Sequence, residues 1–188
     1  MNSAKIYNDL KNSANGAKAH FEVWWALASR AKPEFVSVLD QHSDFFRAAF
    51  DAHYTSYFVY LAHLFDERKD SSSIPRYFDA ISSTSKATTL QLLKMRFAEL
   101  EKRAKPLITV RHKTVAHIDV KLTEKDVFMP LNITWNVVRN IIYDVSQFVK
   151  EIDPAPVSEG VGYIGVPRDE RLIEATMKIL QVLSNKQV

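Results

Sequence analysis

Apolar residues recur at three- and four-residue steps along several long stretches, and this pattern constrains the fold more than any other feature. Over residues 3–31 the stripe consists of Ile6, Leu10, Ala14, Ala17, Phe21, Trp24 and Ala28. Such spacing places apolar side chains on one face of an α-helix. The chain contains only four glycines, whereas sheets joined by tight turns need more. The sequence therefore predicts an all-α protein.

The other apolar stripes predict a helical bundle. Further long helices are expected over 44–67, 85–104 and 132–152, short extra helices over 33–42 and 74–83, and a candidate C-terminal accessory helix over 169–185. Lys105-Pro106 is expected to kink or restart the helix after the one predicted over 85–104. A length of 188 residues suits one domain. We predict a single domain over 1–188, a bundle of four to five long helices.

The composition excludes several classes of protein. The chain has no cysteine, which excludes disulfides, thiolate metal sites and cysteine nucleophiles. It has no run of eighteen apolar residues, and its first residues lack the apolar core of a secretory signal. We therefore expect a cytoplasmic protein that does not insert into membranes. The net charge of +3 permits contact with nucleic acid without arguing for it.

Motifs for metals and for common catalytic loops are missing from the sequence. Helical bundles that bind two metal ions use Glu-x-x-His pairs, and none occurs here. His63 and Asp66 are one helical turn apart, but two ligands do not make a metal site. GxxxxGK[ST] and GxSxG are also absent. The sequence thus predicts no metal and no cofactor, and a di-metal helical enzyme is the disfavoured alternative.

An arginine and a histidine with five residues between them form the main candidate site. Residues 110–119 read VRHKTVAHID, with Arg111 and His117 as the pair. This spacing alone is weak, because about one such match is expected by chance in a chain of this composition. A second match, Arg47 and His53, lies inside the aromatic stripe of residues 44–67 and is interpreted as structural. That aromatic stripe is itself interpreted as core, with a base-stacking surface as the minority alternative.

The neighbours of Arg111 and His117 distinguish the first match from the second. Polar His112 and Lys113 follow the arginine, and the small Ala116 leaves access beside His117. Asp119 is close enough in sequence to orient the imidazole.

These residues carry a resemblance to a known family. RHKTVAHID resembles the R-x(4–6)-H signature of the HEPN superfamily (higher eukaryotes and prokaryotes nucleotide-binding), and more narrowly its abortive-infection Abi-U-type branch. LFDERKDSSSIPR (64–76) is similar to the Leu-Phe-Asp segment that precedes a Ser-Ile loop in that branch. The resemblance implies an HEPN-like helical bundle that dimerises. It also implies a metal-independent endoribonuclease of phage defence or toxin-type stress control, whose site is shared between two subunits.

The resemblance further implies roles and partners. Arg111 and His117 take the catalytic positions, and His112 takes that of the polar residue after the arginine. Expected partners are an RNA substrate and a second copy, with an antitoxin or regulatory protein as a further candidate. HEPN toxins that are modified by a nucleotidyltransferase often carry a tyrosine two residues after the histidine. Asp119 stands there in this chain, so control through that tyrosine is not expected.

The residue types suit RNA cleavage without a metal. Histidine titrates near neutrality and can transfer protons, while arginine binds phosphate through two hydrogen bonds. On a regular helix, residues six apart lie about 9 Å apart along the axis and roughly 120° around it. Arg111 and His117 of one chain therefore do not converge by helix geometry. Either a second copy or a distorted helix after Pro106 would bring an arginine to a histidine.

Several residues keep two interpretations. His112 either assists proton transfer or is an exposed polar residue. Lys113 would lower the pKa of His117 if it is close, whereas Asp119 would raise it. Asp66 either reaches the site from a neighbouring helix or caps the start of a loop. The remaining histidines are expected to satisfy local packing and hydrogen bonds: His20, His42, His53 and His63.

A rival function comes from a different class of protein. A catalytically inactive helical module of HEPN type that binds a partner protein or a nucleotide also fits this sequence. The modest net charge and the lack of an obvious basic track support that alternative.

Overall fold

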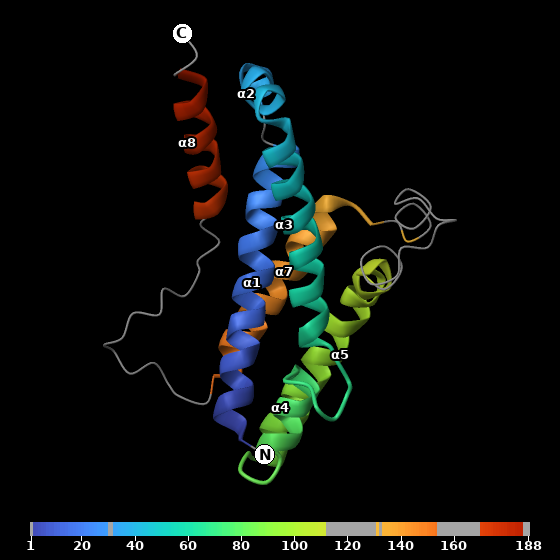
Figure 1. Ribbon diagram of the computed structural model, residues 1–188. Helices are drawn as coiled ribbons and strands as arrows, with labels where there is room; N and C mark the ends of the chain where they lie inside the picture. Colours follow the sequence, from blue (N-terminus) through green and yellow to red (C-terminus); the bar gives the residue numbers. More distant parts are fainter. Residues whose placement is uncertain (1, 30–31, 112–130, 132, 154–169, 186–188) are drawn as a thin grey trace.

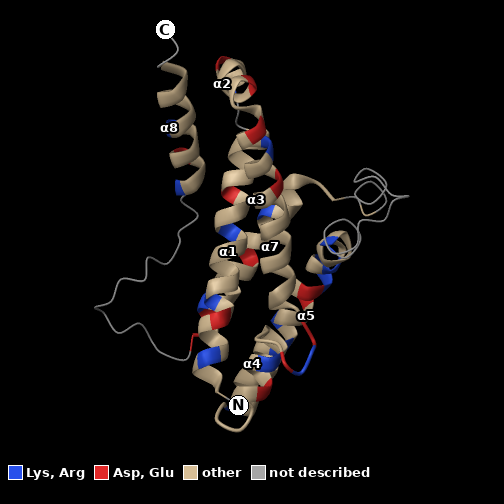
Figure 2. Cartoon of the chain, viewed as in Figure 1, with Lys and Arg blue, Asp and Glu red and all other residues tan. Residues whose placement is uncertain are grey.

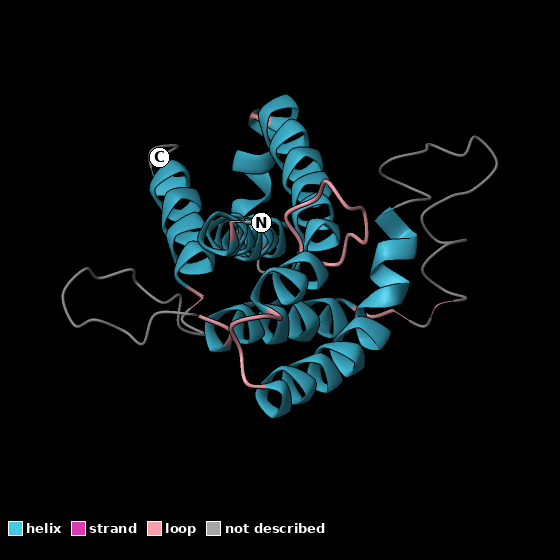
Figure 3. Ribbon diagram, turned by 90° about the horizontal axis from the view of Figure 1, so that it is seen from below, coloured by secondary structure: helices cyan, strands magenta, loops and turns pink. Residues whose placement is uncertain are grey.

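The computed structural model describes residues 2–29, 32–111, 131, 133–153 and 170–185. Every regular element within these ranges is a helix, as Figure 3 shows. The elements are α1 (Ser3–Ser29), a 3₁₀ turn η1 (Pro33–Phe35), α2 (Val36–Gln41), α3 (Ser43–Leu64), α4 (Ile74–Ile81), α5 (Ala87–Val110), α7 (Trp135–Glu151) and α8 (Arg171–Asn185). The predicted all-α bundle is confirmed, including its long helices and its short extra ones.

The long helices pack around α1. This helix lies beside α3 along much of its length, and it also contacts α7 and α8 (Figure 1). Helix α5 packs against α3 and α7, on the side of the bundle away from α8. The predicted accessory helix α8 therefore docks on the bundle, at the face of α1 opposite to α5.

The α1–α3 contact is close because a glycine faces an aromatic ring. A Cβ atom added to Gly16 would lie 2.9 Å from three ring atoms of Tyr60, closer than real side chains approach. Glycine costs a helix about 1 kcal/mol relative to alanine, and here it lets α3 approach α1. Further along the seam, the Phe21 and Tyr57 rings meet edge to face with centroids 5.5 Å apart. Most of the aromatic stripe of α3 is buried, in agreement with its interpretation as core.

Helix α5 continues through its proline, contrary to the predicted end at residue 104. It runs to Val110, and the backbone N–H of Arg111 donates to the carbonyls of Leu107 and Ile108. Pro106 removes one helical hydrogen bond and crowds the preceding turn, at a cost of about 3 kcal/mol. The buried side chains of Ala104, Leu107 and Val110 flank the proline and hold both halves of the helix against the core. Tertiary packing thus overrides the local break, and Arg111 ends this helix instead of starting a new one.

A buried ion pair links α1 to α7 and α8. Lys18 Nζ lies 3.3 Å from Glu22 Oε1, and both side chains are only 2% exposed. The Tyr143 hydroxyl donates to Glu22 Oε1 at 3.0 Å, and the Leu172 backbone N–H donates to Glu22 Oε2 at 3.3 Å. Burial and the neighbouring Glu22 carboxylate raise the pKa of Tyr143, so this hydroxyl remains a donor. Glu22 therefore connects three helices through one carboxylate.

Glu22→Gln should destabilise the fold strongly. The substitution leaves the Lys18 ammonium buried without a charged partner, and breaking a buried pair costs about 3–5 kcal/mol. The free energy of unfolding in urea measures the effect. Lys5→Gln is the matched control, since it removes the exposed Lys5–Asp9 pair and should cost less than about 1 kcal/mol. Equal losses in the two variants would contradict a structural role for the buried pair.

A histidine pair lies in the same α1–α3 seam. The Nδ1 atoms of His20 and His53 are 2.8 Å apart, and the His20 ring stacks on Tyr60 with centroids 5.6 Å apart. The predicted hydrogen-bonding role of these two histidines is confirmed. Burial lowers the pKa of His20, and burial together with the neighbouring His20 lowers the pKa of His53.

This pair should make stability depend on pH. A histidine whose pKa is lowered by folding binds its proton more readily in the unfolded chain, so acid favours unfolding. Its stabilising contribution is complete above the unfolded pKa of 6.5 and is lost as the pH falls toward the lowered folded values. Unfolding temperatures measured on both sides of pH 6.5 should show this loss. The double variant His20→Gln/His53→Gln should flatten it, whereas exposed His42→Gln should not. An unchanged profile in the double variant would contradict the assignment.

Candidate active site

A cleft of about 850 Å³ opens between α3, the loop that follows it, and α5. Its apolar walls come from Val59, Ala62, Phe65, Ala98 and Ile108. Its polar lining carries both signs of charge: His63, Asp66, Glu67, Arg68, Glu101, Lys102, Lys105 and Arg111. The cleft therefore offers an apolar surface surrounded by groups that bind phosphate, transfer protons or accept hydrogen bonds.

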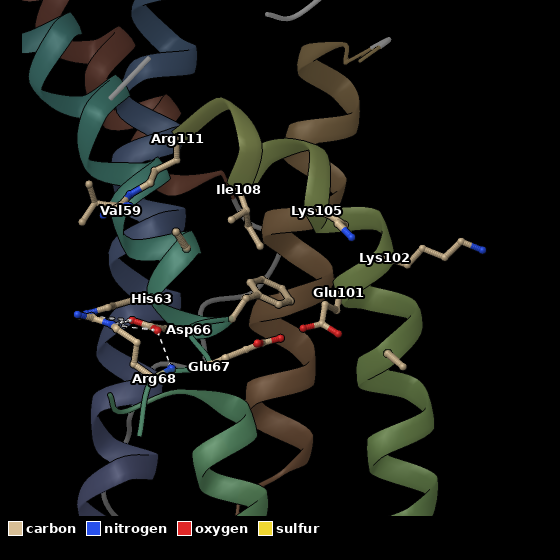
Figure 4. Close-up of a pocket in the computed structure, with 13 residues that line it drawn as sticks. Val59, His63, Asp66, Glu67, Arg68, Glu101, Lys102, Lys105, Ile108 and Arg111 are labelled. Carbon is tan, nitrogen blue, oxygen red and sulfur yellow. Dashed lines mark hydrogen bonds and ion pairs between the residues drawn. The ribbon is translucent and has the colours of Figure 1, made fainter. Parts of the chain in front are cut away.

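Arg111 reaches into this cleft from the end of α5. Its side chain extends toward α3 and ends beside Val59 (Figure 4). Val59, Ala62 and His63 lie on one face of α3 because they are three and four residues apart. Continuation of α5 through Pro106 is what carries Arg111 to this position. A helix ending at residue 104 would have left it on a separate segment.

Asp66 organises the loop that closes the lower end of the cleft. Arg68 Nη2 donates to Asp66 Oδ2 at 2.7 Å, and the Arg68 backbone N–H donates to Oδ1 at 3.0 Å. The Ser71 hydroxyl donates to the carbonyls of Asp66 and Arg68, and the Ser72 hydroxyl donates to Asp9 of α1 at 2.7 Å. The hydrogen bond from Arg68 lowers the pKa of Asp66, with a smaller contribution from the charge of His63. Asp66 is thus an ionised carboxylate with its partners in place.

Two carboxylates face each other across the cleft, one from the loop after α3 and one from α5. Glu67 follows α3 and Glu101 lies on α5, and Figure 4 shows their carboxyl groups pointing toward one another. Burial raises the pKa of Glu101, the charge of Glu67 raises it further, and Lys105 opposes the rise. This part of the cleft is therefore acidic, whereas the Arg111 end is basic.

The charges around the cleft are mixed over a wider area as well. Figure 2 shows basic and acidic residues along α5 and on the loop after α3. Arg96 pairs with Glu151 at 2.6 Å and Arg103 with Asp144 at 2.6 Å, both across the α5–α7 contact. These outer cations pair with carboxylates of α7, whereas Lys102, Lys105 and Arg111 line the cleft itself.

The structure brings two of the predicted site residues together. Arg111 and Asp66 line the same cleft, and the bonds from Arg68 to Asp66 are those expected of a residue that caps the start of the loop. The other predicted site residues lie outside the described part of the chain: His112, Lys113, His117 and Asp119.

His63 was expected to satisfy local packing and hydrogen bonds. Its side chain is exposed instead of packed, and it lines the cleft with Arg111. His42 is exposed too, outside any core. One signal in the sequence pointed to His63. It lies one turn before Asp66 and directly precedes residues 64–76, which carry part of the family resemblance.

One glycine pattern in the sequence lies outside the described residues. Residues 160–165 read GVGYIG and match G-x-G-x-x-G. That motif binds dinucleotides at a strand-to-helix turn. The part of the chain that the structure describes contains helices but no strand, and 160–165 lie outside it.

The described residues contain no candidate metal cluster and no candidate membrane span. No group of three or more histidine, aspartate or glutamate side chains there could hold a metal ion. Among the helices of the same residues, none combines the length and the apolar character needed to cross a lipid bilayer.

Comparison with known proteins gives one match. The family model HEPN_AbiU2, described as AbiU2, matches residues 3–153, which span α1 to α7 and end before α8. No curated protein matches the chain, and no solved structure does.

Proposed function

The chain belongs to the AbiU2 family of HEPN proteins, and from this premise we propose that it is a metal-independent endoribonuclease. The proposed setting is phage defence or toxin-type stress control. RNA is the proposed substrate, and an antitoxin or regulatory protein is a candidate partner.

The position of Arg111 is the observation that carries the proposal. It is the arginine of the R-x(4–6)-H motif, and its side chain lies in a cleft that also holds His63 and Asp66. A guanidinium binds phosphate oxygens through two parallel hydrogen bonds and stays charged at any physiological pH. An apolar wall beside it excludes water and strengthens its interaction with developing negative charge.

The proposed reaction uses the RNA itself as the nucleophile. The imidazole of His117 removes the proton from a 2′-hydroxyl, and that oxygen attacks the adjacent phosphorus. Arg111 stabilises the extra negative charge on the phosphorane. The bond from phosphorus to the 5′-oxygen then breaks, and this oxygen takes a proton. The products are a 2′,3′-cyclic phosphate, or its hydrolysed form, and a 5′-hydroxyl.

We propose that two copies of the chain share this site. On a regular helix Arg111 and His117 of the same chain would not converge, whereas a facing copy would bring one arginine near the other's histidine. Val59 of α3 supports the proposal, because it lines the cleft beside Arg111 and is 38% exposed. Exposed apolar side chains of this kind suit a contact between subunits.

Arg111→Ala and His117→Ala should each abolish RNA cleavage. The first removes the charge that stabilises the phosphorane and the second removes the base, so a loss of about 10²–10⁴-fold is expected. Cleavage of a labelled RNA measures the rate, and circular dichroism checks the fold. Arg47→Ala is the matched control, since this exposed arginine belongs to the other R-x-H match and should leave the rate unchanged.

Two substrate and cofactor controls complete that test. A chelator should not change the rate, and DNA should stay intact because it lacks the attacking 2′-hydroxyl. Cleavage that stops with a chelator would contradict the mechanism. Binding of RNA or of a nucleotide without any cleavage would favour the inactive binding module.

A further inference from the structure

His63 occupies the same wall of the cleft as the tip of Arg111. It lies four residues after Val59, which places it about 6 Å further along the axis of α3 on the same face. Arg111 ends beside Val59, and Figure 4 shows His63 directly below, next to Asp66. A phosphate bound by the guanidinium would therefore have the imidazole within about one helical turn.

His63 is the one histidine among the described residues that line the cleft. The other polar lining groups there are lysines, arginines and carboxylates, and Asp66 is already engaged by Arg68. Histidine is the side chain that gains and loses a proton near neutral pH. Within the described part of this cleft, His63 therefore supplies the imidazole side chain.

The charges around His63 suit a proton donor. The charge of His63 lowers the pKa of Asp66, although Arg68 lowers it more. It also lowers the pKa of Asp9, although Ser72 and Lys5 lower it more. Two carboxylates thus lie near this imidazole, Asp9 on the α1 side and Asp66 on the loop side. Its exposed position leaves the ring accessible to a bound substrate.

Resting on the proposed ribonuclease function, we propose that His63 is a second catalytic residue of this site, the general acid that protonates the leaving 5′-oxygen. In an in-line displacement the attacking and leaving oxygens lie on opposite sides of phosphorus, so one imidazole does not serve both. His117 takes the proton from the 2′-oxygen as the new phosphorus–oxygen bond forms. His63 gives its proton to the 5′-oxygen as the old bond breaks, and Arg111 of the same chain holds the phosphate between them.

The test compares two leaving groups in the variant His63→Gln. The substrates are one RNA with an ordinary 5′-oxygen at a single scissile bond and the same RNA with sulfur in that position. A thiol has a pKa of about 8.5 and leaves as the anion without a proton. His63→Gln should lose about 10²–10⁴-fold in rate on the oxygen substrate and recover to near the wild-type rate on the sulfur substrate. His117→Ala should stay slow on both, because the 2′-oxygen still needs a base.

The controls separate failure of this inference from failure of the proposed function. His42→Gln replaces an exposed histidine outside the cleft and should match the wild type on both substrates. Two results would overturn the role of His63 alone, provided that the wild type cleaves RNA and Arg111→Ala does not. In one, His63→Gln is equally slow on both substrates. In the other, His63→Gln is as fast as the wild type on the oxygen substrate. A wild-type chain that does not cleave RNA at all would overturn the ribonuclease and the general acid together.

Discussion

The close packing of α1 against α3 is the contact on which the rest of the structure depends. Gly16 lets the Tyr60 ring lie against α1, and the aromatic side chains beyond it fill the seam. This contact fixes α3, and α3 in turn supplies one wall of the cleft. The other wall, α5, packs on α3 and α7. The cleft is thus a consequence of the core, because α3 and α5 hold most of its lining residues and the loop after α3 supplies the rest.

Two features set the chemistry of this cleft apart from that of the surrounding surface. Outer cations of α5 pair with carboxylates of α7, as Arg103 does with Asp144, and so they do not form a broad basic track. Arg111 instead stands at the end of its helix beside Val59, while Glu67 and Glu101 face each other lower in the cleft. A local positive charge of this kind suits one phosphate more than a long stretch of nucleic acid backbone.

Apolar periodicity was enough to predict the helices, because α1, α3, α4, α5 and α7 each bury one face in a single core. It did not predict the path of α5. A local rule about proline gave a break at residue 106, whereas burial of Leu107 and Val110 carries the helix on to Arg111. The motif identified Arg111 from its neighbours, and the cleft then joined it to Asp66. The sequence did not place His63 beside Arg111, because their shared cleft depends on the approach of α5 to α3, which no local spacing encodes.

Sharing of the site between two copies is tested most directly by mixing two inactive chains. Arg111→Ala and His117→Ala chains, each inactive alone, would be combined under conditions that exchange subunits, with different tags to confirm that mixed dimers form. Our account predicts that the mixture regains RNA cleavage, since a mixed dimer holds one complete set of Arg111, His63 and the partner's His117. A mixture that contains mixed dimers and remains inactive would contradict it.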